Sequence, residues 1–522
     1  MTALLLATCL ALLLCTQCYG ALPSPKAMSP VKVSPLAKAD VDHSKLHAEE
    51  IKALPKFEDE LNVKPQKHAS HPKLGTRSLV ISILADVCPH GMMPLAYGMA
   101  QGGPTGWVVS LALLVLFGSM STYTMLSYAS LAKTTNSTNI GQIWAKLINR
   151  KTAWVVDASI FALTFGCCVF YSAFIGDIFT ALASATGLGG LFSKRWIVLL
   201  AISSFVLLPL TLLEDLSALS FSSMVGAFGI MYTLFFHTLR STDGTYAVGS
   251  EMLKHVSPKM QPSWPQPKYS KFNVNSGTLV LINMLCVAFL AHYNSINLYD
   301  EFENPTPKRY NFAVGLGFGL SMVVFTCMMF LGYGLFGTAA QPLLLNNFPL
   351  SQDPLATVGR VAVGLAITVA YPLMFAGLKS SMYGIIYRFT KPIAEKNKPK
   401  WQFLASLLPQ DPPKPISERL SKEVKSLSTV AVLVAITAIA VQCGEEDVSI
   451  VLGLVGSVLG CFAAYVLPGV LKLSLMRMRK KAGLKNTVTD VVVNHGLIAI
   501  GVVFGALGVM VTVQNMGSGG HH

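Results

Sequence analysis

Residues 85–94 read ADVCPHGMMP and interrupt a stretch that is otherwise apolar from about residue 79 to 101. Within ten positions the chain places two prolines, a glycine, an acid and an imidazole. Pro89 removes a backbone donor, and Gly91 tolerates the irregular backbone that results. An ionisable residue such as Asp86 at membrane depth is by default functional or paired. We therefore expect a broken helix with a binding site here; a plain proline kink facing lipid is the alternative.

Composition places this stretch in a membrane. Of 522 residues, 52% are hydrophobic and 13% are charged, which leaves too few charges to cover a water-soluble body of this size. One helical span needs roughly 20 apolar residues, and lipid satisfies no backbone hydrogen bonds, so the long apolar runs predict helices. The fold class is therefore an all-α membrane protein.

The apolar runs predict eleven spans. They cover about residues 79–101, 105–131, 154–183, 195–213, 217–239, 276–300, 310–337, 355–376, 427–443, 448–472 and 488–513. Of the 40 Lys and Arg, 22 fall in the even-numbered connections, 8 on the opposite side and 10 in the N-terminal tail, which puts the even connections and the tail on the cytosolic-type side. Topology and anionic lipid heads account for the net charge of +14, so no nucleic-acid partner is needed.

The N-terminal region divides into two segments. Residues 1–20 have the short apolar core of a signal peptide or signal anchor, which predicts entry through the secretory pathway. Residues 21–77 form a disordered tail whose first part resembles a plastid transit segment. Cleavage would deliver this tail to the lumen, against the charge count, so an uncleaved anchor, a second import step or an inverted topology stays open. The final membrane, whether plasma membrane, endomembrane or plastid envelope, stays open too.

Several motifs resemble one family. Residues 91–103, GMMPLAYGMAQGG, are similar to the first helix of the amino acid/auxin permease family, closest to its sodium-coupled neutral amino acid transporter branch, where the pattern is close to GAGILGLPYAFAQAG. Further matches follow in chain order: 171–177 (YSAFIGD), 208–219 (LPLTLLEDLSAL), 288–301 (AFLAHYNSINLYDE), 332–337 (GYGLFG) and 368–381 (TVAYPLMFAGLKSS). The resemblance covers about residues 75–515.

The resemblance implies a five-plus-five inverted repeat of the LeuT type within a transporter domain at 78–515. Repeat one would cover about 79–239 and repeat two about 276–472, followed by an extra helix at about 488–513 and a flexible end at 516–522. It implies a monomeric secondary active transporter that moves amino acids by alternating access, coupled to a proton or sodium gradient and without a cofactor. The alternative is an amino acid sensor without sustained flux. No GxSxG, HExxH or Walker motif points to an enzyme.

The family's substrate site lies at breaks in the first and sixth helices. Carried over, it predicts substrate contacts at Pro89, His90, Gly91, Met92, His292, Asn294 and Ser295. Backbone N–H groups near Gly91 would receive the carboxylate, as helix N-termini receive anions generally. For His292, a histidine satisfied inside the bundle is the alternative.

The chain departs from the family at the ion site. Ala85 stands where the sodium-coupled branch has an asparagine, although Thr368 retains a hydroxyl in the eighth span. Because Asp86 is adjacent and a buried carboxylate is able to take up a proton near neutral pH, proton coupling becomes credible beside sodium coupling. Asp177 matches a family aspartate and is predicted to be a structural or gating partner or an ion-coupling group. Asp157 is expected to be a solvated residue at a helix end or a helix cap.

The chain also departs at the two breaks themselves. Pro89 and His90 replace small residues, and Tyr293 and Asn297 replace prolines. We therefore expect a pocket that is smaller or differently polar than the family's.

Overall fold

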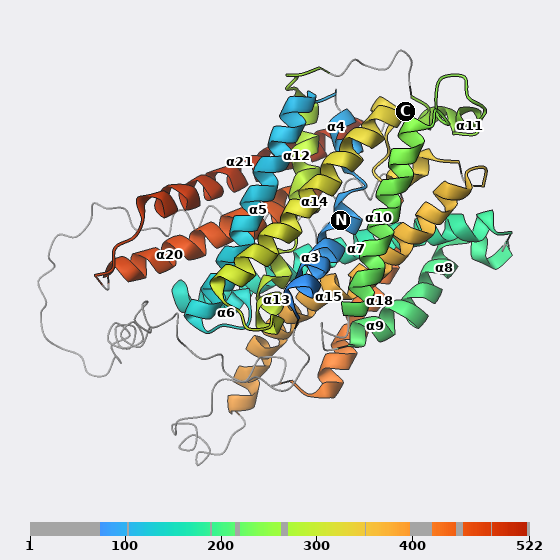
Figure 1. Cartoon of the computed structure of the whole chain (residues 1–522). Helices are drawn as coiled ribbons and strands as arrows, with labels where there is room; N and C mark the ends of the chain where they lie inside the picture. The colour runs from blue at the N-terminus through green and yellow to red at the C-terminus, as the bar shows by residue number, and fades with distance from the viewer. Residues whose placement is uncertain are drawn as a thin grey trace, which may run out of the picture.

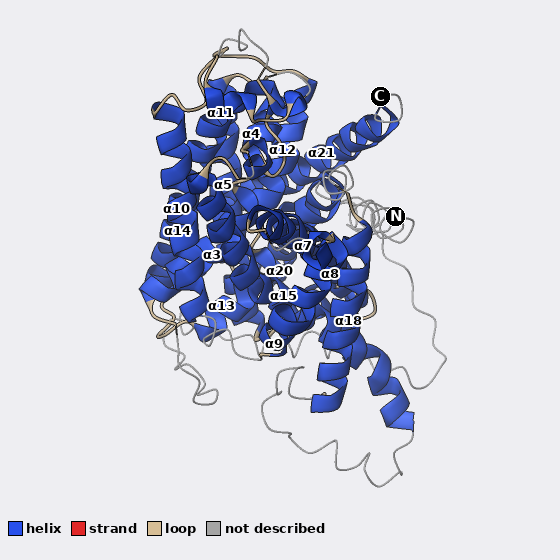
Figure 2. Ribbon diagram, turned by 90° about the vertical axis from the view of Figure 1, so that its right-hand side faces the viewer, coloured by secondary structure: helices blue, strands red, loops and turns tan. Residues whose placement is uncertain are grey.

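The computed structural model describes residues 74–101, 104–187, 190–213, 220–262, 270–349, 351–396, 420–444, 453–481 and 483–518. Within these ranges the chain is a bundle of helices without strands, joined mainly at its two opposite ends (Figures 1 and 2). The expected signal segment 1–20, the tail to residue 73 and the last four residues lie outside the described part.

The helices follow the predicted spans in order (Figure 1). They are α3 (Thr76–Gly91) with α4 (Leu95–Ala100), α5 (Trp107–Thr135), α7 (Ala153–Ala185), α8 (Arg195–Ile202) with η3 (Ser203–Leu207) and α9 (Leu208–Leu212), α10 (Ser220–Thr242), α12 (Ser276–Ala288) with α13 (Ser295–Glu301), α14 (Pro307–Phe336), α15 (Pro354–Lys396), α18 (Lys422–Gln442), η9 (Val455–Gly460) with η10 (Phe462–Val466) and α20 (Leu467–Lys481), and α21 (Val488–Ser518). Short helices α6 (Ile140–Leu147) and α11 (Glu251–Lys254) lie in connections.

Nine helical runs among the described residues are long and apolar enough to cross a membrane, and the chain is a multi-pass membrane protein. The other two predicted spans, α3 with α4 and α10, are helical at the expected places without belonging to that set. The count of eleven spans therefore stays a prediction. Helix α15 also continues to Lys396, well past the expected end of the eighth span at residue 376.

Two helices are interrupted at the centre of the bundle. Helix α3 carries Pro89 in its last turn and ends at Gly91, and α4 begins after Pro94, whose missing N–H favours such a restart. Helix α12 ends at Ala288, and the chain passes through η6 (His292–Asn294) before α13 begins. Residues 289–294 contain no proline or glycine, so side-chain contacts described below account for the second break.

Corresponding helices of the two halves make equivalent packing contacts. Helix α10, fifth in the first half, lies against α3 and α15, and η9, fifth in the second half, lies against α12 and α7. Likewise α14 packs on α3, and α5 packs on α12 and α13. Each fifth helix thus contacts the first helix of its own half and the third helix of the other half, and each second helix contacts the first helix of the other half, as expected of an inverted repeat.

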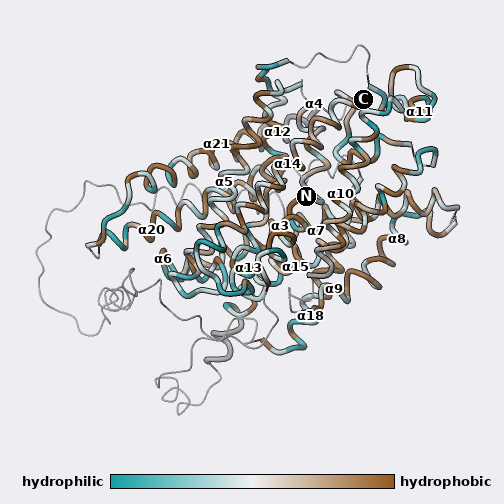
Figure 3. Tube along the Cα trace, in the orientation of Figure 1, coloured by the Kyte–Doolittle hydropathy of each residue, from teal (hydrophilic) through white to brown (hydrophobic). Residues whose placement is uncertain are grey.

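Helix α10 illustrates how the bundle faces lipid. Met224, Phe228, Met231 and Phe235 recur at helical spacing and are all more than half exposed. On the opposite face Gly229 lies so close to Ala362 that an added Cβ would come within 2.5 Å of the Ala362 carbonyl. Hydrophobic residues predominate along α3, α8 and α9, whereas hydrophilic residues gather at α6, α11 and the far end of α20 (Figure 3).

Candidate functional site

The site centres on the carboxylate of Asp86 in α3, which is 1% exposed. Tyr293 donates its hydroxyl to Oδ1 at 2.7 Å, and Asn294 donates its amide to Oδ2 at 3.1 Å. The same amide donates to the carbonyl of Leu373 in α15 at 2.8 Å. Three elements far apart in sequence therefore meet at Asp86, and both hydrogen bonds that reach its carboxylate in the described part come from neutral groups.

His90 bridges the two broken helices. Its Nε2 lies 3.1 Å from the Val287 carbonyl near the end of α12, and its Nδ1 lies 2.5 Å from the Tyr171 hydroxyl of α7. A carbonyl only accepts, so Nε2 carries a hydrogen and donates it to Val287, whereas the Tyr171 hydroxyl is able either to donate to Nδ1 or to accept from it. Both ring nitrogens are therefore engaged.

The residues around His90 bring the helix ends into contact. Pro89, Gly91 and Met92 are all buried. A Cβ added to Gly91 would collide with the Phe325 ring and lie 2.8 Å from the Ala288 carbonyl. Only glycine therefore allows the end of α3 to approach the end of α12 so closely.

His292 and Ser295 turn towards α5 rather than Asp86. His292 Nε2 lies 2.8 Å from the Thr124 hydroxyl, and the Ser295 hydroxyl donates to the Met125 carbonyl at 2.7 Å. These bonds, with those of Asn294, hold the chain in its non-helical path between α12 and α13. Two buried atoms beside the break, His292 Nδ1 and Asn294 Oδ1, have no hydrogen-bond partner among the residues that the structure describes.

The other two predicted ion-coupling residues lie in separate contacts. Asp177 forms an ion pair with Arg195 at 2.6 Å, and Arg195 also donates to the Ala440 carbonyl at the end of α18. Thr368 donates its hydroxyl to the Gly364 carbonyl at 2.7 Å, within its own helix. Within the described residues, the hydrogen bonds to the Asp86 carboxylate come from Tyr293 and Asn294, and from neither Asp177 nor Thr368.

Asp157 corrects one expectation. It is not a solvated helix end: its side chain is 3% exposed and accepts from Arg388 of α15 at 3.0 Å. A Cβ at Gly141 would collide with its carboxylate, so the start of α6 packs directly on it. A buried acid among apolar residues gave no local signal, because its partner lies 231 positions away.

A small cavity lies between Asp157 and the site, at the end of the bundle where α6 and α13 lie (Figure 1). Its polar lining consists of Thr138, Asn139, Asp157, Asn297, Ser380 and Ser381. Tyr293 and Gly377 close the cavity on the side of Asp86. The sequence did not predict that Tyr293 contacts Asp86 or that Tyr171 contacts His90. For Tyr293, the available signal was that this tyrosine stands where the family has a proline.

Comparison with known proteins assigns this architecture to a family. The model described as transmembrane amino acid transporter protein matches residues 72–514. Vacuolar amino acid transporter 6 of Saccharomyces cerevisiae is 21% identical over 428 residues, covering 79% of this chain and 92% of the relative. Sodium-coupled neutral amino acid transporter 7 of Xenopus laevis is 21% identical over 403 residues, covering 74% and 78%.

A solved structure agrees with the fold. The crystal structure of MhsT in complex with L-phenylalanine matches 85% of this chain and 100% of its own, with a TM-score of 0.51 and 12% identity. This likeness confirms the LeuT-type inverted repeat expected from the sequence, and the matched relatives carry the names of transporters and not of enzymes. The chain belongs to the transmembrane amino acid transporter family.

Proposed function

We propose that this protein carries amino acids across its membrane by alternating access, with the substrate held between the breaks of α3 and α12. The observation that carries the proposal is the meeting of the two interrupted helices, where Gly91 touches the Ala288 carbonyl beside buried polar groups. Interrupted helices at the bilayer midplane supply backbone groups and half-helix dipoles that suit a zwitterion. The names of the relatives, both amino acid transporters, support the same class of substrate.

His90 indicates how a substrate would be recognised. Its Nε2–H occupies the Val287 carbonyl, and its Nδ1 occupies the Tyr171 hydroxyl. An amino acid offers the same pair of functions, an ammonium donor and a carboxylate acceptor on one carbon. The imidazole of His90 therefore occupies the place where the ammonium and carboxylate of an amino acid would bind. The substrate would enter as the His90 side chain rotates away.

Asp86 is the proposed coupling group. A buried carboxylate without a cationic partner is costly, so its site favours a bound cation. Sodium requires several oxygen ligands, whereas Tyr293 and Asn294 direct hydrogens at this carboxylate. A proton requires a single oxygen and leaves both donors in place. We therefore propose proton coupling through Asp86, with Asp177 and Thr368 acting structurally.

Uptake by proteoliposomes tests the proposal. Purified protein is reconstituted, and uptake of radiolabelled amino acids is measured under separately imposed proton and sodium gradients. We expect uptake driven by the proton gradient, lost in Asp86→Asn and retained in the exposed control Asp490→Asn. Uptake driven by sodium alone would refute the proposed ion, and binding without flux would point to the sensor.

We also propose an endomembrane location. The yeast relative is named a vacuolar transporter, which supports this choice over the plasma membrane. Microscopy of the full-length chain with a C-terminal fluorescent tag tests it. A signal at the cell surface would overturn the assignment without affecting transport.

A further inference from the structure

Tyr293 occupies the boundary between the Asp86 site and the cavity near α6. Its hydroxyl donates to Asp86 at 2.7 Å, and the residue also lines the cavity. Its side chain is 5% exposed, so the ring is enclosed on nearly all sides. One side chain therefore touches both compartments.

Gly377 makes room for this ring. A Cβ at that position would lie 2.5 Å from Cδ2 of Tyr293 and 3.1 Å from its Cβ. Such distances are far below ordinary contact, so any larger residue at 377 would displace the ring. The position of Tyr293 thus depends on two independent features, the hydrogen bond to α3 and the absence of a side chain on α15.

The cavity beyond Tyr293 carries several polar groups on its wall. Asn139, Asn297, Ser380 and Ser381 bring amides and hydroxyls to its wall. Asp157 also lines the cavity, and its ion pair with Arg388 joins α7 to α15. A water-accessible passage from Asp86 to the α6 end of the bundle would run through this cavity once the ring moved.

We propose that Tyr293 is the gate between the substrate site and the α6 end, and that its hydrogen bond to Asp86 is the latch. The inference rests on the proposed transport function. When the phenol leaves Asp86, the ring moves away from the boundary between the Asp86 site and the cavity and so opens the passage. The Tyr293 hydroxyl holds the gate closed through its hydrogen bond to Asp86 Oδ1, and Asp86 is also the residue proposed to bind the coupling cation. Cation binding at Asp86 and opening of the gate therefore involve the same carboxylate oxygen.

Cysteine labelling tests the gate without requiring transport. Membrane vesicles that contain the full chain, with the α6 end of the bundle facing the outside solution, are treated with a small charged methanethiosulfonate. Modification of each cysteine is then measured by peptide mass spectrometry. Cys167 of α7 is 3% exposed and lies within electrostatic range of Asp86, so it reports the compartment behind the gate. Ser380→Cys, at a partly exposed position that lines the cavity, reports the cavity itself.

We expect Ser380→Cys to react in every background, whereas Cys167 reacts slowly in the parent chain. Tyr293→Phe keeps the ring and loses the latch, which should raise the Cys167 rate about tenfold, the scale set by one hydrogen bond to a charged group. Gly377→Ala should raise it as well, with the hydroxyl intact. The matched control Tyr299→Phe, which alters a tyrosine of α13 away from Asp86, should leave the rate unchanged.

The outcomes separate this proposal from the function it rests on. An unchanged Cys167 rate in both Tyr293→Phe and Gly377→Ala would overturn the gate, even if Asp86→Asn abolishes uptake. An unreactive Ser380→Cys would overturn the passage through the cavity. Raised Cys167 rates in a chain without amino acid uptake would keep the gate and remove the proposed function.

Discussion

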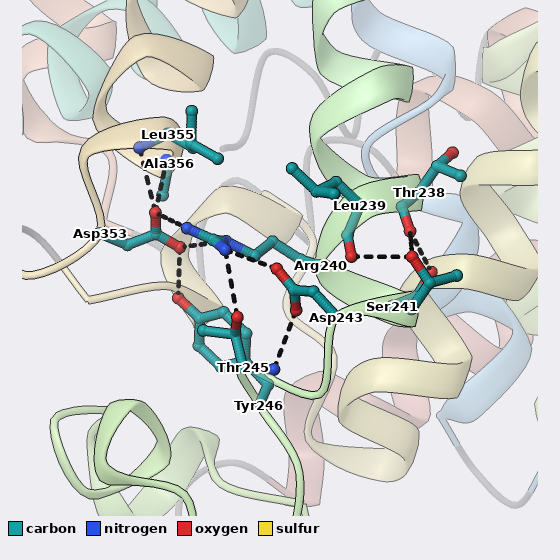
Figure 4. A network of polar contacts seen from close by, with 11 residues as sticks. Thr238, Leu239, Arg240, Ser241, Asp243, Thr245, Tyr246, Asp353, Leu355 and Ala356 are labelled. Carbon is teal, nitrogen blue, oxygen red and sulfur yellow. Dashed lines mark hydrogen bonds and ion pairs between the residues drawn. The ribbon is translucent and has the colours of Figure 1, made fainter.

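The guanidinium of Arg240, at the end of α10, binds both carboxylate oxygens of Asp353, with Nη2 at 2.6 Å from Oδ1 and Nε at 2.8 Å from Oδ2 (Figure 4). Asp353 is 0% exposed, and it also accepts from Tyr246 and from the first amides of α15. This network lies at the opposite end of the bundle from α6 and ties the connection after α10 to the start of α15. Bidentate geometry and burial make it stronger than a surface ion pair.

Replacing Asp353 by Asn should destabilise the folded protein. The amide cannot accept at both positions, so Arg240 and Tyr246 lose partners, at a cost of about 1–3 kcal/mol. We expect a lower apparent Tm in detergent, measured by intrinsic fluorescence. Glu251→Gln breaks an exposed pair with Lys254 and serves as the control, with no change expected. Equal melting of the Asp353 variant and the parent would contradict the role given to the network.

The same network predicts a pH dependence. Burial raises the pKa of Asp353, but hydrogen bonds from Arg240 and Tyr246 and the Ala356 amide outweigh it, and the pKa lies below the ordinary value of 3.8. A lowered folded-state pKa contributes stability that is present above the unfolded-state value and is lost as pH falls through the folded-state value. The pKa of Asp243, beside Arg240, is lowered too, so its contribution has the same sign.

We therefore expect the Tm difference between the parent and Asp353→Asn to be constant near neutral pH and to shrink below about pH 4. Melting curves from pH 7 to pH 3 measure it. A difference that grows on acidification would show that the sign is wrong.

The sequence predicted the parts of the site that depend on local backbone chemistry. Pro89, Gly91 and Pro94 restrict the chain in ways that hold in any context, so the first break was predictable. The second break could be placed only through the family resemblance, because contacts with α5 and α15 maintain it. The bond between Tyr293 and Asp86 joins positions 207 residues apart, and no local pattern signals it.

The fold followed the same rule. Apolar runs located the helices closely, because burial in lipid is a property of each run by itself. Asp157 was misplaced since its position near the start of α7 looked like a helix end, while its burial depends on Arg388 and α6. Whether an acid such as Asp157 is buried depends on ion pairs and packing with other helices of the bundle. The sequence of one span does not contain that information.

Removing the imidazole of His90 should widen the range of substrates. His90→Ala frees the Val287 carbonyl and the Tyr171 hydroxyl and leaves space at the meeting point of the breaks. We expect uptake of large amino acids relative to small ones to rise about tenfold, the scale on which a pocket discriminates one or two methylene groups. Competition by a panel of unlabelled amino acids measures it, with the exposed His495→Ala as control. An unaltered preference order would place the substrate elsewhere.

Adding a methyl group at Gly91 should impair binding through the contact between the two breaks. In Gly91→Ala the new Cβ meets the Phe325 ring and the Ala288 carbonyl, an overpacking that costs about 1–3 kcal/mol. The ring is able to yield and the carbonyl is not, so Phe325→Ala added to Gly91→Ala should restore part of the lost affinity. Equilibrium binding by scintillation proximity, compared across the two single variants and the double variant, isolates the coupling between these positions. If the effects of Gly91→Ala and Phe325→Ala on the binding free energy are strictly additive, Phe325 does not take part in the contact that the new Cβ makes. If Gly91→Ala alone binds substrate with full affinity, the substrate does not bind where α3 and α12 meet.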